Sequence, residues 1–334
     1  MKLAEFSYEL PSELIAQYPA QERDKCRLMV MDRAAHTIEH KTFTDITEYF
    51  KEGDCLVLNN TRVIPARLFA KRKTGGKVEI FLLEKKDPVS DALIRPTARV
   101  KEGEKVLLES GDEAEVMGRS EVGRYVKFAR PLDDILREAG HIPLPPYISR
   151  RDEARDKSDY QTVYGVKEGA TASPTAGLHF TDDILEKIRA KGVNIAYVTL
   201  HTNYGTFRPI KCEDIEGHKM HAEYFELTQE AADTVRRTKD SGGAVFAVGT
   251  TTNRVLEHCG SALKASSGRT GLFIYPGYRF KVVDHLITNF HLPCSTLFIL
   301  ASAFAGNEFI MKAYRKAIEE HYRFFSYGDA TLIL

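Results

Sequence analysis

The chain alternates short, largely apolar segments with helical patterns, and no other feature of the sequence constrains its fold as strongly. Such segments occupy residues 55–58, 194–200, 244–248, 272–274, 285–288 and 331–334. A strand that is apolar along most of its length is typical of a sheet with both faces covered. We therefore predict an α/β fold, in which a mostly parallel sheet is covered by helices.

Helices are expected between these segments, and capping residues mark some of their ends. Thr181 precedes two aspartates that suit the positive end of a helix dipole, and Gly192 ends the same helix. The other helices are expected at residues 229–239, from about residue 253, and, as a pair, between residues 295 and about 322.

A different pattern follows the first apolar strand. Between residues 67 and 129, short alternating strands are separated by glycine turns, as at Gly75-Gly76 and Gly111. Closely spaced strands of this kind predict a small antiparallel β-barrel. A short helix lies between Pro131 and Gly140, and residues 143–147 form a proline-rich connector. The predicted domains are residues 1–66 and 150–334 for the α/β unit and residues 67–149 for the inserted barrel.

Charge and cysteine content exclude several classes of protein. The 47 Lys and Arg balance 47 Asp and Glu, which excludes a globally basic nucleic-acid binder but is compatible with a local basic patch. The five cysteines form no Cys-x-x-Cys pair, which argues against a disulfide framework or a thiolate metal site and fits a reducing cytoplasm. The most apolar segment, 297–305, is shorter than the roughly 20 residues of a membrane helix. We therefore expect a cytoplasmic protein with no membrane partner.

Several common motifs are missing from the sequence. No Gly-x-Gly-x-x-Gly follows the first strand, and the chain has neither a P-loop nor a Gly-x-Ser-x-Gly elbow. These observations argue against a Rossmann dinucleotide site, a P-loop NTPase and a serine hydrolase.

Polar loops directly follow five of the predicted strands. They lie at residues 59–62, 201–206, 249–254, 275–278 and 289–291. In an open α/β sheet, ligands bind outside the carboxyl ends of the strands. One polar loop is ordinary turn chemistry, but five at the same edge favour a substrate site there.

Residues 174–181, Pro-Thr-Ala-Gly-Leu-His-Phe-Thr, lead into a helix. Small residues such as Gly177 let backbone N–H groups approach a ligand, and a helix N-terminus favours an anionic group such as a carboxylate. The alternative interpretation is a simple helix-entry turn around a packed Phe180.

Histidines are frequent between residues 179 and 291, and histidine is the natural proton carrier near neutral pH. One alternative interpretation is a metal site formed by His218, His221 and Glu223. However, Gly217 weakens the helix that such a site needs, and the His-Glu-x-x-His order is missing. Hydrogen bonding to substrate or within the structure is the preferred interpretation, and no metal is expected.

Two further patterns indicate contact with a nucleic acid. Aromatic and charged residues alternate at 322–329, which suits stacking on an unstacked base, although a core strand would use the same residues. Basic clusters at residues 71–73 and 150–151 lie in or beside the predicted barrel. This part of the surface is therefore interpreted as facing RNA, with solvated charge as the alternative.

Several long motifs together resemble one family. They are Leu-Asn-Asn-Thr-Arg at 58–62, Pro-Leu-Pro-Pro-Tyr-Ile at 143–148, the segment 174–181, Gly-Thr-Thr at 249–251, Thr-Asn-Phe-His-Leu-Pro at 288–293 and the segment 322–329. Along its whole length the chain resembles the S-adenosylmethionine:tRNA ribosyltransferase-isomerase family of queuosine biosynthesis.

The resemblance implies an activity and partners. Members transfer the ribosyl part of S-adenosylmethionine to 7-aminomethyl-7-deazaguanine at the tRNA wobble position and isomerise it, which gives epoxyqueuosine-tRNA and releases adenine and methionine. S-adenosylmethionine is then a consumed substrate, so no cofactor and no metal are implied. The implied fold is an α/β unit with an inserted β-barrel, the partner is a tRNA carrying the precursor base, and we expect a monomer.

The resemblance also implies roles for particular residues. The proposed route begins with removal of a proton beside the sulfonium, which requires a base, and the candidates for proton transfer are His179, His291 and His201. Arg62 is expected to hold a carboxylate by a two-pronged contact, and aromatic side chains near the C-terminus are expected to stack the modified base. The substrate-binding candidates are Asn59, Asn60, Thr61, Arg62, Thr175, Gly177, Gly205, Thr206, His221, Glu223, Gly249, Thr250, Thr251, Arg254, Tyr275, Asn289, Phe325, Tyr327 and Asp329. The tRNA-binding candidates are Lys71, Arg72, Arg150 and Arg151.

A few positions depart from the usual family pattern. Cys26 stands where members usually have Ser, Ser173 where they have Ala, and Thr202-Asn203 where they have Val-Gly. Asn adopts unusual backbone conformations less freely than Gly, so the resemblance says least about the loop at residue 203.

Three other functions remain open from the sequence. A methyltransferase would use the same donor, although the missing glycine-rich loop argues against it. The others are a non-catalytic tRNA-binding module built on the barrel and a metal-dependent hydrolase that uses His218, His221 and Glu223.

Overall fold

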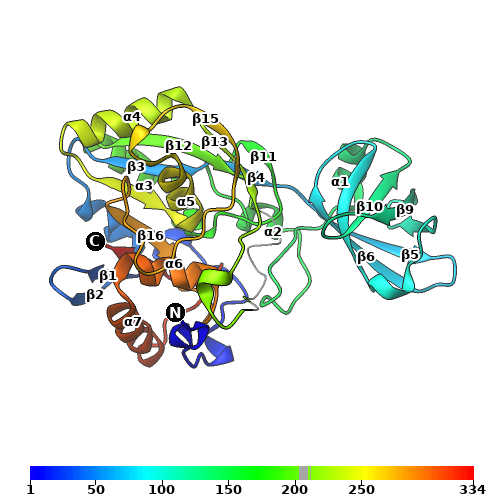
Figure 1. Ribbon diagram of the computed structural model, residues 1–334, viewed down its shortest axis with the longest axis horizontal. Helices are drawn as coiled ribbons and strands as arrows, with labels where there is room; N and C mark the ends of the chain where they lie inside the picture. Colours follow the sequence, from blue (N-terminus) through cyan, green and yellow to red (C-terminus); the bar gives the residue numbers. More distant parts are fainter. Residues whose placement is uncertain (203–209, 211) are drawn as a thin grey trace.

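The computed structural model arranges the chain in two units (Figure 1). The structure describes residues 1–202, 210 and 212–334. One unit holds a large sheet with helices packed around it, and the other is a β-barrel that projects from its side. Both chain termini lie in the α/β unit, so the barrel is an insertion within the chain.

The large sheet is mixed. In spatial order it contains β15 (Ser266–Thr270), β13 (Glu223–Leu227), β12 (Asn194–Leu200), β3 (Cys55–Asn59), β14 (Val245–Val248), β16 (His285–Asn289), β17 (Ala330–Ile333), β1 (Arg27–Asp32) and β2 (Thr37–Thr42). The central strands β12, β3, β14 and β16 are parallel. Antiparallel pairs flank them on both sides, at β15–β13, β13–β12, β16–β17 and β1–β2. The α/β architecture agrees with the prediction, but the expected mostly parallel sheet is corrected to a mixed one.

The predicted strand at residues 272–274 was wrong. Its backbone groups form hydrogen bonds with side chains: Leu272 N–H donates to Thr270 Oγ1, and the Leu272 carbonyl accepts from Arg254 Nε. The strands in this region are β13 and β15, which pair with each other. β15 is the edge strand and β13 lies between β15 and β12. Polar residues interrupt both sequences, so neither has the continuous apolar run that was used to find the other strands.

Side chains of the central strands alternate between two cores, as the two-residue period of a strand requires. Val57 and Ala247 belong to a core shared with helices α4 (Gln229–Asp240), α5 (Gly249–Cys259), α6 (Thr296–Ala305) and α7 (Asn307–Glu319). Leu56 and Phe246 belong to a second core, shared with α3 (Asp182–Ala190). Helices therefore cover both faces of the parallel part of the sheet.

Side-chain caps mark the starts of α3 and α4. Thr181 Oγ1 accepts from Ile184 N–H at 3.3 Å, and Thr228 Oγ1 accepts from Ala231 N–H at 3.2 Å. Helix α5 starts at Gly249 rather than near residue 253. Gly249 has a φ of +84°, which only glycine adopts freely, and this lets the chain pass from β14 directly into the helix.

The inserted barrel is closed and antiparallel. It contains β5 (Arg67–Arg72), β6 (Lys77–Glu84), β7 (Val89–Arg95), β8 (Lys105–Leu108), β9 (Glu113–Arg119) and β10 (Arg124–Phe128). Helix α1 (Leu132–Ala139) packs on the same core, which is separate from the cores of the α/β unit. The domain bounds at residues 66/67 and 149/150 stay a prediction.

Short elements join the two units. The parallel pair β4 (Thr61–Val63) and β11 (Lys167–Ala170) and helix α2 (Asp156–Asp159) lie beside the chain crossings. In the part of the chain that the structure describes, no helix has the length and apolar character needed to cross a bilayer.

Candidate functional site

A cavity of about 200 Å³ lies at the carboxyl edge of the parallel strands. Its walls come from the segments that follow β12, β14 and β16, from the 172–176 segment, and from the turn before β17. Among the predicted site residues, the lining includes Thr175, Gly249, Thr250, Thr251, Asn289, His291 and Phe325. The cavity therefore lies where the polar loops after β12, β14 and β16 meet, as expected for a ligand site at the carboxyl ends of the strands.

The electrostatics of the cavity come from helix ends. Gly249, Thr250 and Thr251 form the first turn of α5, and Ser295 caps α6 through a 3.1 Å hydrogen bond from Phe298 N–H. Backbone N–H groups at these two helix ends carry partial positive charge. Among the described lining residues, none is Asp, Glu, Lys or Arg. The cavity therefore offers N–H groups, hydroxyls and apolar surface.

Asn289 connects this cavity to the buried His179. Its Nδ2 donates to Phe325 O at 3.1 Å and to His179 Nε2 at 3.0 Å. Because Nε2 accepts, the proton of the neutral ring sits on Nδ1, which lies 3.1 Å from Cys26 Sγ. Burial lowers the pKa of His179 to about 4. His179 faces a second, smaller cavity of about 70 Å³ instead of the main one.

His291 lines the main cavity. Its Nε2 lies 2.8 Å from Thr288 Oγ1, and its backbone N–H donates to Tyr314 Oη at 3.1 Å. Burial lowers the pKa of His291 to about 3, so the ring is neutral at physiological pH. Of the three histidine candidates, His291 is the one that lines this cavity.

His201 and the 59–61 segment form a separate hydrogen-bonded group. His201 Nδ1 lies 2.8 Å from Thr61 Oγ1, and burial lowers the pKa of His201. Asn59 Nδ2 donates to Leu200 O at 3.1 Å and to Thr251 Oγ1 at 3.2 Å, while Asn60 Oδ1 accepts from Thr199 Oγ1 at 2.7 Å. These side chains hold the ends of β3 and β12 together, and Asn59 orients a residue of the cavity wall.

Arg62, Gly177 and Tyr275 lie outside the main cavity. The exposed Arg62 side chain donates to Gly165 O at 3.4 Å, so the structure does not bring it to a carboxylate site in this cavity. A Cβ on Gly177 would lie 2.0 Å from Tyr164 Oη, which gives this glycine a packing role. Tyr275 packs against the core beside Phe273.

Glu223 and Arg254 form a buried ion pair of 2.6 Å, with exposed side-chain fractions of 2% and 3%. Arg254 also donates to Leu272 O and Thr270 O. Both residues therefore hold β13, α5 and β15 together, and neither lines the main cavity. His221 is exposed. Within the described ranges, no group of three His, Cys, Asp or Glu side chains is placed to hold a metal ion.

The C-terminal turn positions Phe325 at the cavity. Asp329 accepts from Arg27 N–H at 2.9 Å and from Arg323 N–H at 2.7 Å, and burial raises its pKa. Tyr327 donates to Asp156 Oδ1 at 2.8 Å and faces the smaller cavity. Asp329 and Tyr327 therefore fix the turn, whereas Phe325 is available to a ligand.

The four basic candidates differ in their surroundings. Arg72 pairs with Glu104 at 2.6 Å, and Arg150 pairs with the buried Asp156 at 2.7 and 2.8 Å. Lys71 and Arg151 are exposed. Arg72 and Arg150 are therefore engaged in ion pairs within the protein, whereas Lys71 and Arg151 are cations on the surface. Gly205 and Thr206 lie outside the described residues.

A family model described as queuosine biosynthesis protein matches residues 3–333. The chain belongs to the queuosine biosynthesis protein family. This confirms the resemblance drawn from the motifs.

Relatives of this queuosine biosynthesis protein match over their whole length. The chain is 53% identical over 337 residues to the S-adenosylmethionine:tRNA ribosyltransferase-isomerase of Sulfurihydrogenibium sp. (strain YO3AOP1), with 100% of each chain covered. It is 51% identical to the protein of the same name from Clostridioides difficile (strain 630), again with 100% of each covered. It is also similar to the crystal structure of S-adenosylmethionine tRNA ribosyltransferase from Thermotoga maritima, with 40% identity, a TM-score of 0.58, and 99% and 100% of the two chains covered.

Sequence reasoning missed several residues that line the cavity of this family member. Tyr147 comes from the connector between the barrel and α/β unit, and its hydroxyl lies 2.6 Å from Ser326 Oγ. Ser173 and Thr202 also line the cavity. Sequence signals for them were present: Tyr147 belongs to the 143–148 motif, Thr202 lies in the polar loop at 201–206, and Ser173 directly precedes the 174–181 motif.

Proposed function

We propose that this chain is an S-adenosylmethionine:tRNA ribosyltransferase-isomerase of queuosine biosynthesis. It joins the ribosyl part of S-adenosylmethionine to the amine of 7-aminomethyl-7-deazaguanine in tRNA and isomerises that part to the epoxide. One new bond forms to the substrate amine and one carbon–carbon bond closes the cyclopentane ring, using the electron pair left when the proton beside the sulfonium is removed, while the bonds to adenine and to the methionine sulfur break. The observation that carries the proposal is the full-length match, at 53% identity, to a relative of this name.

The main cavity supports S-adenosylmethionine as the consumed substrate. The N-terminal turn of α5 suits the methionine carboxylate, because its N–H groups carry partial positive charge. The aromatic rings of Tyr147 and Phe325, whose centroids are 4.7 Å apart, suit the sulfonium or the flat base. Excluding water from such a pocket would strengthen these interactions.

His291 is the proposed proton-transfer residue. It lines the cavity, and the neutral ring is the form that accepts a proton from the methylene beside the sulfonium. His179 is reassigned as a positioning residue, because it faces the smaller cavity and its Nε2 holds the amide of Asn289, a residue of the main cavity wall. Asn59 and Thr175 have the same kind of role, since they bond to Thr251 and Asn289 at the cavity wall.

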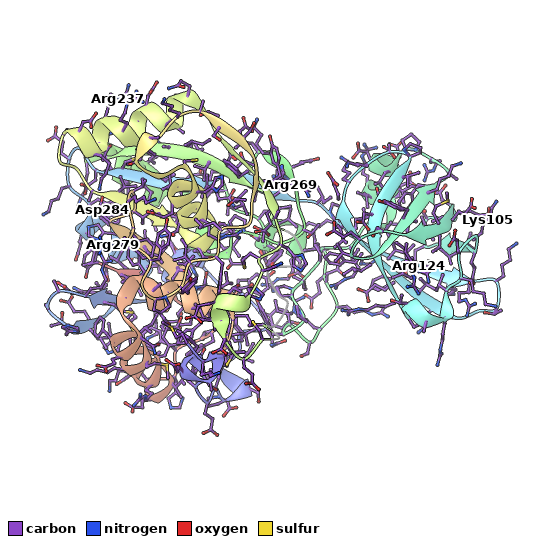
Figure 2. All side chains as sticks on the ribbon, viewed as in Figure 1. Lys105, Arg124, Arg237, Arg269, Arg279 and Asp284 are labelled. Atoms are coloured by element: carbon purple, nitrogen blue, oxygen red, sulfur yellow. The ribbon has the colours of Figure 1, made fainter. Side chains whose placement is uncertain are left out.

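The tRNA surface is proposed on the side of the barrel that carries Lys71 and Arg151. Arg151 lies 5.7 Å from the centre of the Phe69 ring, so a cation and an aromatic ring share one exposed face. Figure 2 shows that charged side chains are spread over both units, with Lys105 and Arg124 on the barrel and Arg237 on α4 far from it. We therefore place the tRNA contact at Lys71, in β5, and at Arg151, which lies over Phe69 of the same strand.

The function is tested with S-adenosylmethionine that carries one label in the ribose and another in the methyl group. Purified protein and precursor-bearing tRNA should place the ribose label in the tRNA and release adenine and methionine. Transfer of the methyl label alone would establish the methyltransferase alternative. Binding of tRNA without release of adenine would establish a non-catalytic module.

We propose that the enzyme works as a cytoplasmic monomer, and that it uses neither a metal nor a further cofactor. Full activity after chelation would support the second point, and loss of activity that one metal restores would contradict it.

A further inference from the structure

A further cavity of about 250 Å³, the barrel cavity, lies on the outer face of the inserted barrel. Its lining residues are Arg67, Glu79, Phe81, Leu93, Arg95 and Pro146. Five of them come from β5, β6 and β7, and the sixth comes from the proline-rich connector to the α/β unit. None of the six lines the main cavity.

The strand register brings these side chains together. Arg67 pairs with Phe81, and Phe81 pairs with Leu93, so the three form one row across the strands. In the next row Glu79 and Arg95 are directly opposite each other. The residues between these rows belong to the core of the barrel. Because side chains alternate along a strand, both rows point outward from the barrel.

The floor of the barrel cavity is apolar and its rim is charged. Phe81 is 6% exposed, whereas Arg95 is exposed to solvent. Arg67 Nε lies 3.2 Å from Glu79 Oε1, and Arg67 Nη2 donates to Leu144 O at 3.1 Å, so this guanidinium group is fixed beside the connector. An aromatic floor suits the face of a flat base, and guanidinium groups at the rim suit a phosphate.

The same face of the barrel carries an excess of positive charge. The row that follows Glu79 and Arg95 pairs Lys71 with Lys77, and both of these lysines are exposed. The three rows therefore hold four cations, Arg67 being the fourth, and one carboxylate. Single-stranded RNA is bound by this combination, in which cations follow the backbone and aromatic side chains pack against unstacked bases.

The connector places the barrel cavity next to the main cavity. Pro146 lines the barrel cavity, and the next residue, Tyr147, lines the main cavity. Because Cα atoms of consecutive residues are about 3.8 Å apart, only one short segment separates the two cavities. An RNA strand that brings one base to the main cavity therefore has a neighbouring nucleotide beside the barrel cavity.

We propose that the barrel cavity binds the nucleotide next to the wobble base of the tRNA, with its base on Phe81 and a phosphate held by Arg95. The proposal deepens the proposed function and rests on it, since it takes tRNA as the partner and the main cavity as the place where the wobble base is modified. It adds a site for one base to the surface cations Lys71 and Arg151.

Phe81→Leu and Arg95→Gln test the two contacts in the full-length protein. Each should weaken, about fivefold or more, the Kd of an anticodon stem-loop that carries the precursor base, which is the usual effect of losing one stacked base or one charged contact. Arg95→Gln should also reduce the salt dependence of binding by about one unit of slope. Tyr125→Leu and Lys127→Gln are the matched controls and should bind like wild type, because both residues are exposed on β10 and do not line the cavity.

A thermal melt and calorimetry with S-adenosylmethionine separate RNA binding from folding. Arg95→Gln should keep the Tm of wild type, because this side chain is exposed. Both variants should keep the wild-type Kd for S-adenosylmethionine, because neither residue lines the main cavity. A loss of RNA binding that is confined to Phe81→Leu and accompanied by a lower Tm would make the ring structural and overturn the proposal.

Stem-loops that lack the base on the 5′ or on the 3′ side of the precursor base identify the bound nucleotide. With one of these two probes, wild type should lose about the same factor that Phe81→Leu loses, and Phe81→Leu should lose nothing further, as a coupled pair requires. Tyr125→Leu should lose as much as wild type. Full and independent losses in Phe81→Leu with both probes would overturn the proposal.

Adenine release by wild type from S-adenosylmethionine and precursor-bearing tRNA, measured in parallel, tests the proposed function separately. Release by wild type together with unchanged stem-loop binding by both cavity variants would overturn the barrel site alone. No release together with the coupled result for the stem-loops would overturn the proposed activity and support the barrel site.

Discussion

The side-chain amide of Asn289 donates a hydrogen bond of 3.0 Å to Nε2 of His179, so one residue of the cavity wall is held by a histidine that lies behind it. The same amide donates to Phe325 O, which fixes its orientation. The histidine that the sequence made the first candidate for proton transfer therefore supports the wall instead of facing the main cavity.

This arrangement predicts different results for two substitutions of His179. His179→Ala should lower kcat by about tenfold or more, because Asn289 loses an acceptor worth about 1 kcal/mol and can shift. His179→Gln should recover much of the rate, since its amide oxygen can accept the same bond. Steady-state kinetics across pH checks this, and equal, severe loss in both variants would restore the base role.

The buried histidines predict a pH dependence of stability. Burial lowers the pKa of His179 to about 4 and that of His291 to about 3, below the value of about 6.5 for an unfolded histidine. At a pH between the folded and the unfolded pKa, the unfolded chain binds protons that the folded chain does not. The contribution of these histidines to stability is therefore complete above about pH 6.5 and is lost progressively as the pH falls below it. The free energy of unfolding should fall by up to about 1.4 kcal/mol per pH unit for each histidine in that window.

Urea titrations at pH 7.5 and pH 5 measure this slope. The His291→Gln protein should show a smaller pH dependence than wild type, whatever its stability at pH 7.5. An identical slope in the two proteins would show that His291 does not titrate as burial predicts.

The buried ion pair predicts that Arg254 acts on stability. Arg254→Ala leaves the carboxylate of Glu223 buried without its 2.6 Å partner, which should cost about 3–5 kcal/mol of unfolding free energy. The double variant Arg254→Met with Glu223→Leu should recover most of that loss. Chemical denaturation is the measurement, and a stable Arg254→Ala protein with a weak Kd for S-adenosylmethionine would instead favour the original substrate-binding assignment.

Arg150 and Arg151 are neighbours in sequence but should respond differently to charge reversal. Arg151→Glu, alone or with Lys71→Glu, should reduce the salt dependence of tRNA binding by about one unit of slope for each lost phosphate contact. Arg150→Glu should instead destabilise the fold, because it places a carboxylate beside the buried Asp156. Arg237→Glu on α4, at the far side of the molecule from the barrel (Figure 2), is the control and should leave the slope unchanged.

Gly177 should tolerate no side chain. In Gly177→Ala the new Cβ would lie 2.0 Å from Tyr164 Oη and 2.8 Å from Thr162 Cγ2, so the segment must shift at a cost of about 1–3 kcal/mol. Gly217→Ala, which meets no heavy atom within 4 Å, should be nearly neutral. A thermal melt compares them, and equal Tm values would remove the packing role of Gly177.

Local sequence signals predicted much of the fold. The strand at 194–200, the cap Thr181 and the helix between Pro131 and Gly140 all depend on residues close in sequence, and each is present in the structure. The predicted strand at 272–274 was wrong, because an apolar segment forms a strand only where a neighbouring strand pairs with its backbone, and here side chains bond to that backbone. Strands β13 and β15 were missed for the converse reason, since their pairing partners, not their composition, make them strands.

The sequence by itself determined the family, the inserted barrel and the edge of the sheet where the cavity lies, because motifs, turn residues and strand periodicity are written along the chain. Only the tertiary structure decided that His291 lines the main cavity while His179 faces the smaller one, and that Arg150 pairs with Asp156 while Arg151 stays exposed. The physical reason is that burial, pKa and ion pairing depend on atoms brought together from distant parts of the chain, and their distances are set only when the two cores pack.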